Sequence, residues 1–247
     1  EAGVEAGVEA GVEAGVEAGV EVEPSPEPVP VIPPDPEPVP LFPYSVASGD
    51  PKQDRVIIWT ALEPDLAAGL LINANNDQIS LGYEVSLLDD FAFEAPVLIG
   101  ETNTSSDSGF TVKVEVNGLE ADAKYVYRFY SVGEDGDRTY SHVGHTRTLP
   151  EMTDEIKLAV CSCANFSSGY FHVYRHISLQ VDLNVVLHLG DYIYESASLG
   201  DENGRRLEQP VEARDIGTYR ARYAEYRLDP DLQALHRAHP MICIWDD

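Results

Sequence analysis

The sequence predicts a multidomain α+β chain: a disordered, acidic, Pro-rich N-terminus, then a β-sandwich, then an incomplete α/β layer. Three observations lead to this prediction. Residues 1–40 consist of a short repeat and a run of prolines, and residues 41–150 hold short stretches of alternating or β-branched residues. From residue 151 onward, apolar runs alternate with helical patterns, which is typical of an α/β layer.

Residues 1–40 have the composition of a disordered segment. Residues 1–20 repeat EAGV five times, so a glycine recurs at every fourth position and opposes a helix, and there is little to bury. Nine prolines follow between Pro24 and Pro40, which favours an extended, semi-rigid spacer. The segment carries ten acidic residues and no basic one. We therefore expect residues 1–40 to be a disordered repeat and linker.

The overall charge excludes some classes of protein. The chain has 247 residues, with 16 Lys and Arg against 43 Asp and Glu, for a net charge of −27. Nucleic-acid binding needs clustered Lys and Arg, so no nucleic-acid-binding surface is expected. No apolar run approaches the roughly 18–20 residues of a membrane-spanning helix, so no membrane span is expected. Three cysteines do not make a disulfide framework.

Residues 41–150 are predicted to form the β-sandwich. Five stretches have the alternation of strands, at residues 55–60, 82–88, 96–101, 110–116 and 124–132, and turn residues separate them. We expect Trp59 to anchor the core, with Leu119 and Tyr127 as neighbours. The run from Leu119 to Tyr125 and Tyr127 resembles the tyrosine-corner strand of fibronectin type III domains.

Residues 151–247 are predicted to form an α/β layer. Strands are expected at residues 156–160, 184–189 and 240–245, and helices at 171–181, 219–227 and 232–238. The middle strand is a continuous apolar run, which predicts a sheet buried on both faces. The chain stops directly after the last strand, an unusual place for a domain to end, so we expect this α/β part to be truncated.

Each of the three predicted strands is followed by candidate metal ligands. They are Cys161 and Cys163, then Asp191 and Tyr194, then Asp246 and Asp247. Parallel strands would place these three ends at one edge of the sheet, where ligands bind in open α/β folds. Gathering thiolate, carboxylate and phenolate groups is unfavourable unless a cation lies between them. The combined pattern therefore predicts a metal site.

Each part of this pattern also has a purely structural interpretation. The cysteines could be small buried residues, the Gly190–Asp191 pair a turn, and His188 a packing residue of its strand. A thiol-redox pair formed by Cys161 and Cys163 is a further alternative, although acidic surroundings would not lower a thiol pKa. Tyr219, Tyr223 and Tyr226 recur at helical spacing and indicate packing. Arginines such as Arg222 are expected to pair with the many acids.

Longer motifs point to a known family. The sequence resembles the PhoD-like alkaline phosphatases (alkaline phosphatase D) from about Phe42 to Asp247. The most specific segments are VVLHLGDYIYE at residues 185–195, YRARYAEYRLDPDLQALHRAHP at 219–240 and IWDD at 244–247. Further matches are FPYSVASGDP, VIIWT, YVYRFYSVG, HTRTLP and CSCANFSSGYFHVYRHI.

This resemblance implies an architecture, a metal centre and a substrate class. It implies a fibronectin-type-III-like domain over 41–150, the first part of a calcineurin-like metallophosphoesterase domain over 151–247, and a centre of iron (Fe³⁺) and calcium. Cys163 matches a metal ligand, Asp191 the bridging catalytic carboxylate and Tyr194 the tyrosine ligand to iron, while Asp247 stands at the position of a further ligand. The implied activity is metal-dependent hydrolysis of phosphate mono- and diesters by a secreted, periplasmic or extracellular enzyme.

The sequence departs from the family pattern at its end. The resemblance implies a His-Glu pair after Asp247 and further Asn, His and Asp ligands, and this chain has none of them. We therefore expect these 247 residues to be a fragment that is inactive alone. The alternative is a non-catalytic β-sandwich surface or interaction module whose α/β part is degenerate or truncated.

Overall fold

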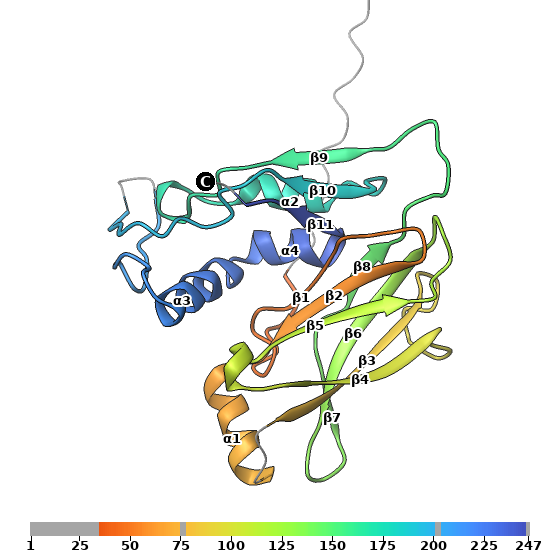
Figure 1. The fold of residues 1–247 in the computed structure, drawn as a ribbon, viewed down its shortest axis with the longest axis horizontal. Helices are drawn as coiled ribbons and strands as arrows, with labels where there is room; N and C mark the ends of the chain where they lie inside the picture. Colours follow the sequence, from red (N-terminus) through yellow and green to blue (C-terminus); the bar gives the residue numbers. More distant parts are fainter. Residues whose placement is uncertain (1–34, 75–77, 201–203, 246–247) are drawn as a thin grey trace, which may run out of the picture. The chain divides into compact units, whose positions relative to one another are not determined.

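Two β-sheets organise the part of the chain that the structure describes (Figure 1). The computed structural model describes residues 35–74, 78–200 and 204–245. One sheet has six strands in the order β5-β2-β1-β11-β10-β9. The other has the order β4-β3-β6-β7, and β8 also pairs with β6. The combination of these sheets with a few helices confirms a mixed α/β architecture.

The first half of the chain contributes eight strands and one helix. In order they are β1 (Val46–Gly49), β2 (Arg55–Ala61), α1 (Pro64–Ala74), β3 (Ile79–Leu87), β4 (Leu98–Thr104), β5 (Thr111–Asn117), β6 (Lys124–Val132), β7 (Arg138–Tyr140) and β8 (Gly144–Arg147). All five predicted strands are present. Helix α1 was not predicted. Strands β1, β7 and β8 were not predicted either, because three or four residues are too few to show a clear alternation.

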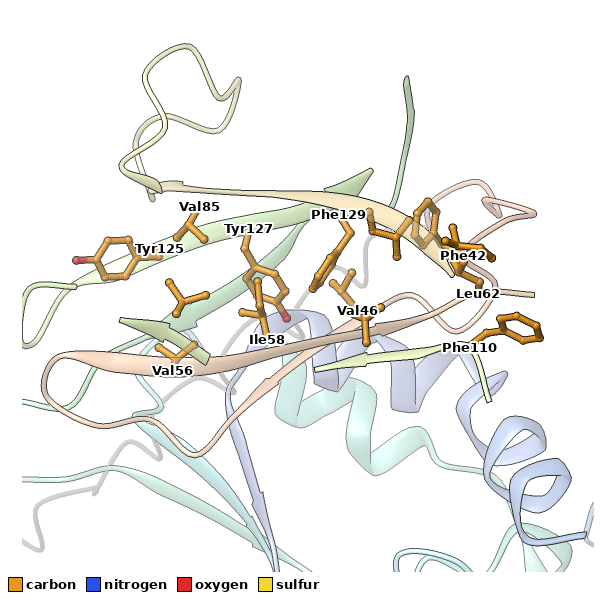
Figure 2. Packing of buried hydrophobic residues seen from close by; sticks show 14 of the residues in the cluster. Phe42, Val46, Val56, Ile58, Leu62, Val85, Phe110, Tyr125, Tyr127 and Phe129 are labelled. Carbon is orange, nitrogen blue, oxygen red and sulfur yellow. The ribbon is translucent and has the colours of Figure 1, made fainter. Parts of the chain in front are cut away.

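The largest apolar core lies between the two sheets (Figure 2). Val56 and Ile58 of β2 point toward Tyr125, Tyr127 and Phe129 of β6, and each of these side chains is at most 2% exposed. Strand β2 alternates between buried and half-buried positions, because successive side chains point to opposite faces of a sheet. The two sheets therefore pack face to face.

The prediction that Trp59 anchors this core is wrong. Trp59 belongs to the half-buried positions of β2, so it faces away from the cluster that contains Leu119 and Tyr127. The guanidinium of Arg227 lies over the Trp59 ring, 4.6 Å from its centroid, and forms a cation–π contact. Strand position was predictable here, but which of the two faces turned inward depended on tertiary packing.

The second half of the chain alternates strands and helices as predicted. It contains β9 (Leu158–Cys161), α2 (His172–Ser178), β10 (Val185–His188), α3 (Ile216–Arg227), α4 (Pro230–Ala238) and β11 (Met241–Cys243). Strand β10 pairs in parallel with both β9 and β11, so the predicted parallel arrangement is confirmed. A second apolar cluster joins α2, α3 and α4 to these strands through Tyr174, Val186, Tyr226, Leu232 and Met241.

The two faces of this parallel sheet differ. Val186 and His188 face α2 and α4 and are fully buried. On the other face, Leu158, Val160 and Ile244 are 45%, 57% and 53% exposed. Within β10, Val185 and Val186 point to opposite faces and are 5% and 0% exposed, so the prediction of a strand buried on both faces holds there. It does not hold for the exposed residues of the neighbouring segments, because the described helices cover one face.

Strand β1 continues the six-stranded sheet across the predicted domain boundary. It pairs antiparallel with β2 and, at Gly49 and Met241, in parallel with β11. A Cβ atom at position 49 would lie 2.6 Å from the Met241 carbonyl oxygen, so the approach of the two strands requires glycine.

The end of the Pro-rich stretch contacts the folded part. Asp35 accepts a hydrogen bond from the Arg175 guanidinium, and the Glu37 carbonyl oxygen lies 2.9 Å from His142 Nε2. Val39 packs against the core between the sheets. The EAGV repeat and the prolines up to Pro34 lie outside the described residues, so the predicted disorder there stays a prediction.

Candidate metal centre

The loops that follow β9 and β10 are joined by backbone hydrogen bonds. Leu189 N–H donates to the Cys161 carbonyl over 2.8 Å, Cys163 N–H to the Gly190 carbonyl over 3.2 Å, and Ala164 N–H to the Asp191 carbonyl over 2.9 Å. Since the two strands are parallel neighbours, both loops leave the same edge of the sheet. This pairing brings the segment around Cys163 beside the segment around Asp191.

Three of the predicted ligand side chains meet at this edge. The Tyr194 hydroxyl donates a hydrogen bond to Asp191 Oδ2, and the Cys163 thiol is near enough to help raise the pKa of this hydroxyl. Cys163 is exposed, while Asp191 and Tyr194 are half-buried, so the cluster opens to solvent. The structure therefore brings Cys163, Asp191 and Tyr194 together, as the sequence analysis expected.

The electrostatics of this cluster favour a cation. The hydrogen bond to Asp191, together with burial and the Cys163 thiol, raises the pKa of the Tyr194 hydroxyl. Three groups that become anions on deprotonation cannot all ionise at this distance without a balancing positive charge. A metal cation would supply that charge and lower the pKa of its donors. The donor chemistry thus fits a metal ion.

Cys163 and Asp191 both have left-handed backbone conformations. Their φ angles are 57° and 53°, in a region that residues other than glycine occupy uncommonly. Such conformations cost of order 1–3 kcal/mol each and tend to occur at functional sites. Each residue lies in the loop that directly follows its strand. Left-handed angles also occur elsewhere among the described residues, at Ser45, Asp50, Phe93, Phe110 and Asp122, so they are not confined to these two loops.

The remaining expected ligand, Asp247, lies outside the described residues. Within them, no group of three or more His, Cys, Asp and Glu side chains is arranged to hold a metal ion. Tyrosine, which supplies one of the three donors here, is not among these four residue types.

Histidines near these loops make hydrogen-bond contacts within the fold. His188 is fully buried, with Nε2 3.2 Å from the Tyr174 hydroxyl, and burial lowers its pKa. His236 is also buried, with Nε2 2.7 Å from the Tyr192 hydroxyl. His172 contacts an Asp231 carboxylate oxygen at 2.8 Å. These contacts agree with packing and hydrogen-bonding roles.

The thiol environment disfavours a redox role. All three cysteines are free, and burial raises the pKa of Cys161 to about 11. Cys161 Sγ donates to the Leu187 carbonyl oxygen over 3.7 Å. A redox-active cysteine needs a lowered pKa and thiolate character, and Cys161 has the opposite.

Two residues of α3 contact the donor loops and were missed as site residues. The Tyr226 hydroxyl oxygen accepts from the N–H groups of Phe166 and Tyr194 over 3.1 and 3.2 Å. Arg222 donates to the Tyr194 carbonyl oxygen instead of pairing closely with an acid. The tyrosine repeat at helical spacing was the available signal, but it indicates packing equally well.

Comparisons with known proteins identify the family. Residues 31–150 match the family model described as "PhoD-like phosphatase, N-terminal domain", and residues 158–247 match "PhoD-like phosphatase". Alkaline phosphatase D of Bacillus subtilis (strain 168) is 34% identical over 212 residues, which cover 83% of this chain and 35% of that protein. The chain thus spans about a third of the length of this relative.

Solved structures agree with this assignment. The structure of PhoD is 34% identical, has a TM-score of 0.70 and matches 87% of this chain and 40% of its own. The purple acid phosphatase PPD1 from yellow lupin seeds has a TM-score of 0.51 at 12% identity, over 82% of this chain and 34% of that one. This second match shows a shared fold. Taken together, these matches show that the chain belongs to the PhoD-like phosphatase family.

Proposed function

We propose that this chain is part of an enzyme that hydrolyses phosphate esters at a metal centre to which Cys163, Asp191 and Tyr194 contribute ligands. The observation that supports it is the convergence of these three donors from two loops at one sheet edge. Family membership supports it independently, since the relative is named for alkaline phosphatase activity. The substrates we propose are phosphate monoesters and diesters.

The chemistry of each donor suggests its role. The Asp191 carboxylate has two oxygens, so it can bridge two cations. The Cys163 thiolate and the Tyr194 phenolate are strong donors that suit a ferric ion, although a thiolate also suits zinc. Iron and calcium are the metals that the family resemblance implies, and we propose them here with Asp247 as a further ligand.

The residues of this chain hold and orient the centre. When bound, the cations would ionise a water molecule and stabilise negative charge on the transferred phosphoryl group. The paired loops after β9 and β10 fix the spacing of the donors, and the exposure of Cys163 leaves the site open to an ester from solvent.

We also propose a domain division at residues 150 and 151, with residues 41–150 forming a fibronectin-type-III-like sandwich. Glu120 N–H donates to the Tyr125 hydroxyl oxygen over 2.9 Å, at the start of β6. This contact supports a tyrosine corner, in which a hydroxyl near the start of a strand bonds the backbone a few residues upstream.

Secretion is proposed from the family resemblance alone. Among the described residues, the structure has no helix of sufficient length and apolarity to cross a bilayer.

The test combines metal analysis with hydrolysis of p-nitrophenyl phosphate in the presence of iron and calcium. We expect the wild-type chain to bind metal and the Asp191→Asn and Cys163→Ser variants to bind it more than about 100-fold more weakly, since even outer-shell changes cost 10- to 100-fold. The three described donors are fewer than two cations need, so turnover by the 247 residues alone should stay near background. Wild-type metal content in both variants would overturn the site.

A further inference from the structure

The helix α3 contacts the backbone of Tyr194 at both its N–H and its carbonyl group. Tyr226 accepts a hydrogen bond from the Tyr194 N–H over 3.2 Å, and Arg222 donates to the Tyr194 carbonyl oxygen. These residues are four apart on one helix, so they lie one above the other on the same face. Both side chains are at most 3% exposed.

The Tyr226 hydroxyl also links the two donor loops. Its oxygen accepts from Phe166 N–H, in the loop after β9 that carries Cys163, and from Tyr194 N–H, in the loop after β10. The Tyr226 ring is fixed in turn by Phe166 and Phe171, whose ring centroids lie 5.3 and 5.9 Å away. One oxygen on a rigid ring therefore sets how the Tyr194 backbone lies relative to the Cys163 loop.

The Arg222 guanidinium also donates hydrogen bonds to backbone carbonyls beyond Tyr194. Besides the Tyr194 carbonyl, it donates to the carbonyls of Ser196, Gln209 and Val211, at 3.3, 3.3 and 2.8 Å. Its closest carboxylate oxygen among the described residues belongs to Glu225, at 3.9 Å. A planar group with five N–H donors can reach several carbonyls in a way that a lysine ammonium cannot.

We infer that Arg222 and Tyr226 are positioning residues of the metal centre, which orient the Tyr194 phenol through its backbone. The inference rests on the proposed function. The same two side chains hold the N–H and the C=O of the residue whose hydroxyl donates a hydrogen bond to Asp191. Outer-shell contacts of this kind tune metal affinity by 10- to 100-fold, because they fix the direction of a ligand.

The experiment compares two single-hydroxyl deletions on α3. Tyr226→Phe removes the oxygen that accepts both N–H groups and keeps the packed ring. Tyr219→Phe removes the same atom from a side chain of the same helix that is 38% exposed. Fe(III), supplied as its nitrilotriacetate complex, is titrated into each protein, and the visible phenolate-to-iron absorption band is recorded with the affinity.

We expect Tyr226→Phe to bind Fe(III) 10- to 100-fold more weakly with a shifted or weakened band, and Tyr219→Phe to match the wild type. Arg222→Lys, which keeps the charge but loses the fork of donors, should behave like Tyr226→Phe. Urea unfolding of every variant shows whether a loss of Fe(III) affinity arises only because a smaller fraction of the protein is folded. A merely structural role would lower stability but leave the band and the affinity of the folded protein unchanged.

The outcomes separate this inference from the proposed function. Wild-type binding and band in folded Tyr226→Phe or Arg222→Lys would overturn the positioning role and leave the metal centre in place. A wild-type protein that binds no iron, or a Tyr194→Phe variant that keeps the band, would remove the proposed centre and the inference with it.

Discussion

The core between the two sheets and the donor cluster of Cys163, Asp191 and Tyr194, in the loops after β9 and β10, gather opposite kinds of side chain. The core gathers apolar side chains such as Ile58 and Phe129, which are almost fully excluded from water. The cluster gathers Cys163, Asp191 and Tyr194 in an open position on two left-handed turns. The first arrangement stabilises the fold, whereas the second brings together three groups that become anions on deprotonation, and we propose that a cation balances them. Changes in the two regions should therefore affect different measurements.

The largest effect on stability should come from the core. Phe129 is fully buried in β6, so Phe129→Ala should lower the free energy of unfolding by about 3–5 kcal/mol through lost burial and a cavity. Phe91 is 55% exposed, and Phe91→Ala should change it by about 0.5 kcal/mol or less. Urea unfolding measures both free energies. Similar losses in the two variants would contradict the claim that Phe129 belongs to the stabilising core and Phe91 does not.

In the donor cluster, a substitution should change metal affinity strongly and stability only slightly. Asp191→Asn keeps the shape of the side chain and removes a charge, so iron affinity should fall more than about 100-fold. In metal-free protein the free energy of unfolding should change by less than about 1 kcal/mol, because the change relieves crowding of potential anions. Metal titration and urea unfolding of the same variant test this, and a large loss of metal-free stability would show that Asp191 belongs to the folding core.

A buried histidine near the cluster gives a pH-dependent contribution to stability. Burial lowers the pKa of His236 well below 6.5, so the unfolded chain binds the proton more readily than the folded one. The contribution is fully present above about pH 6.5 and is lost as the pH falls, by at most about 1.4 kcal/mol per unit for one proton. His236→Gln should flatten this dependence between pH 7 and 5, and an unchanged slope in urea unfolding would contradict the assignment.

The smallest predicted effect concerns one hydrogen bond of the sandwich. Tyr125→Phe removes the acceptor for Glu120 N–H and should cost about 1 kcal/mol. Tyr83→Phe, on the neighbouring strand β3, removes a hydroxyl from a half-buried ring and serves as the control. Equal effects of the two changes would remove the support for a tyrosine corner.

The sequence predicted local features better than pairings between distant segments. The pattern of β6 was predicted at its bounds, Lys124 to Val132, because alternation is a local property. The pairing of β1 with β11 and the outward direction of Trp59 depend on segments far apart in sequence, so composition does not specify them. Helix α1 was not predicted either, because the apolar residues of its sequence, PDLAAGLLINA, show no strong helical period.

Part of the candidate site was predictable for a similar reason. Cys163, Asp191 and Tyr194 follow strand patterns and match a specific family motif, so their meeting at one edge could be expected. Arg222 and Tyr226 lie on a helix at ordinary packing spacing, and their contacts to the donor loops emerge only when α3 is placed against those loops.

The most direct test of this account is an iron titration of the wild-type chain and of its Cys163→Ser, Asp191→Asn and Tyr194→Phe variants. The account predicts that the wild type binds iron with a visible phenolate band, that each variant binds more weakly, and that Tyr194→Phe loses the band. Equal iron affinity in all four proteins would contradict the claim that these three side chains form one metal centre.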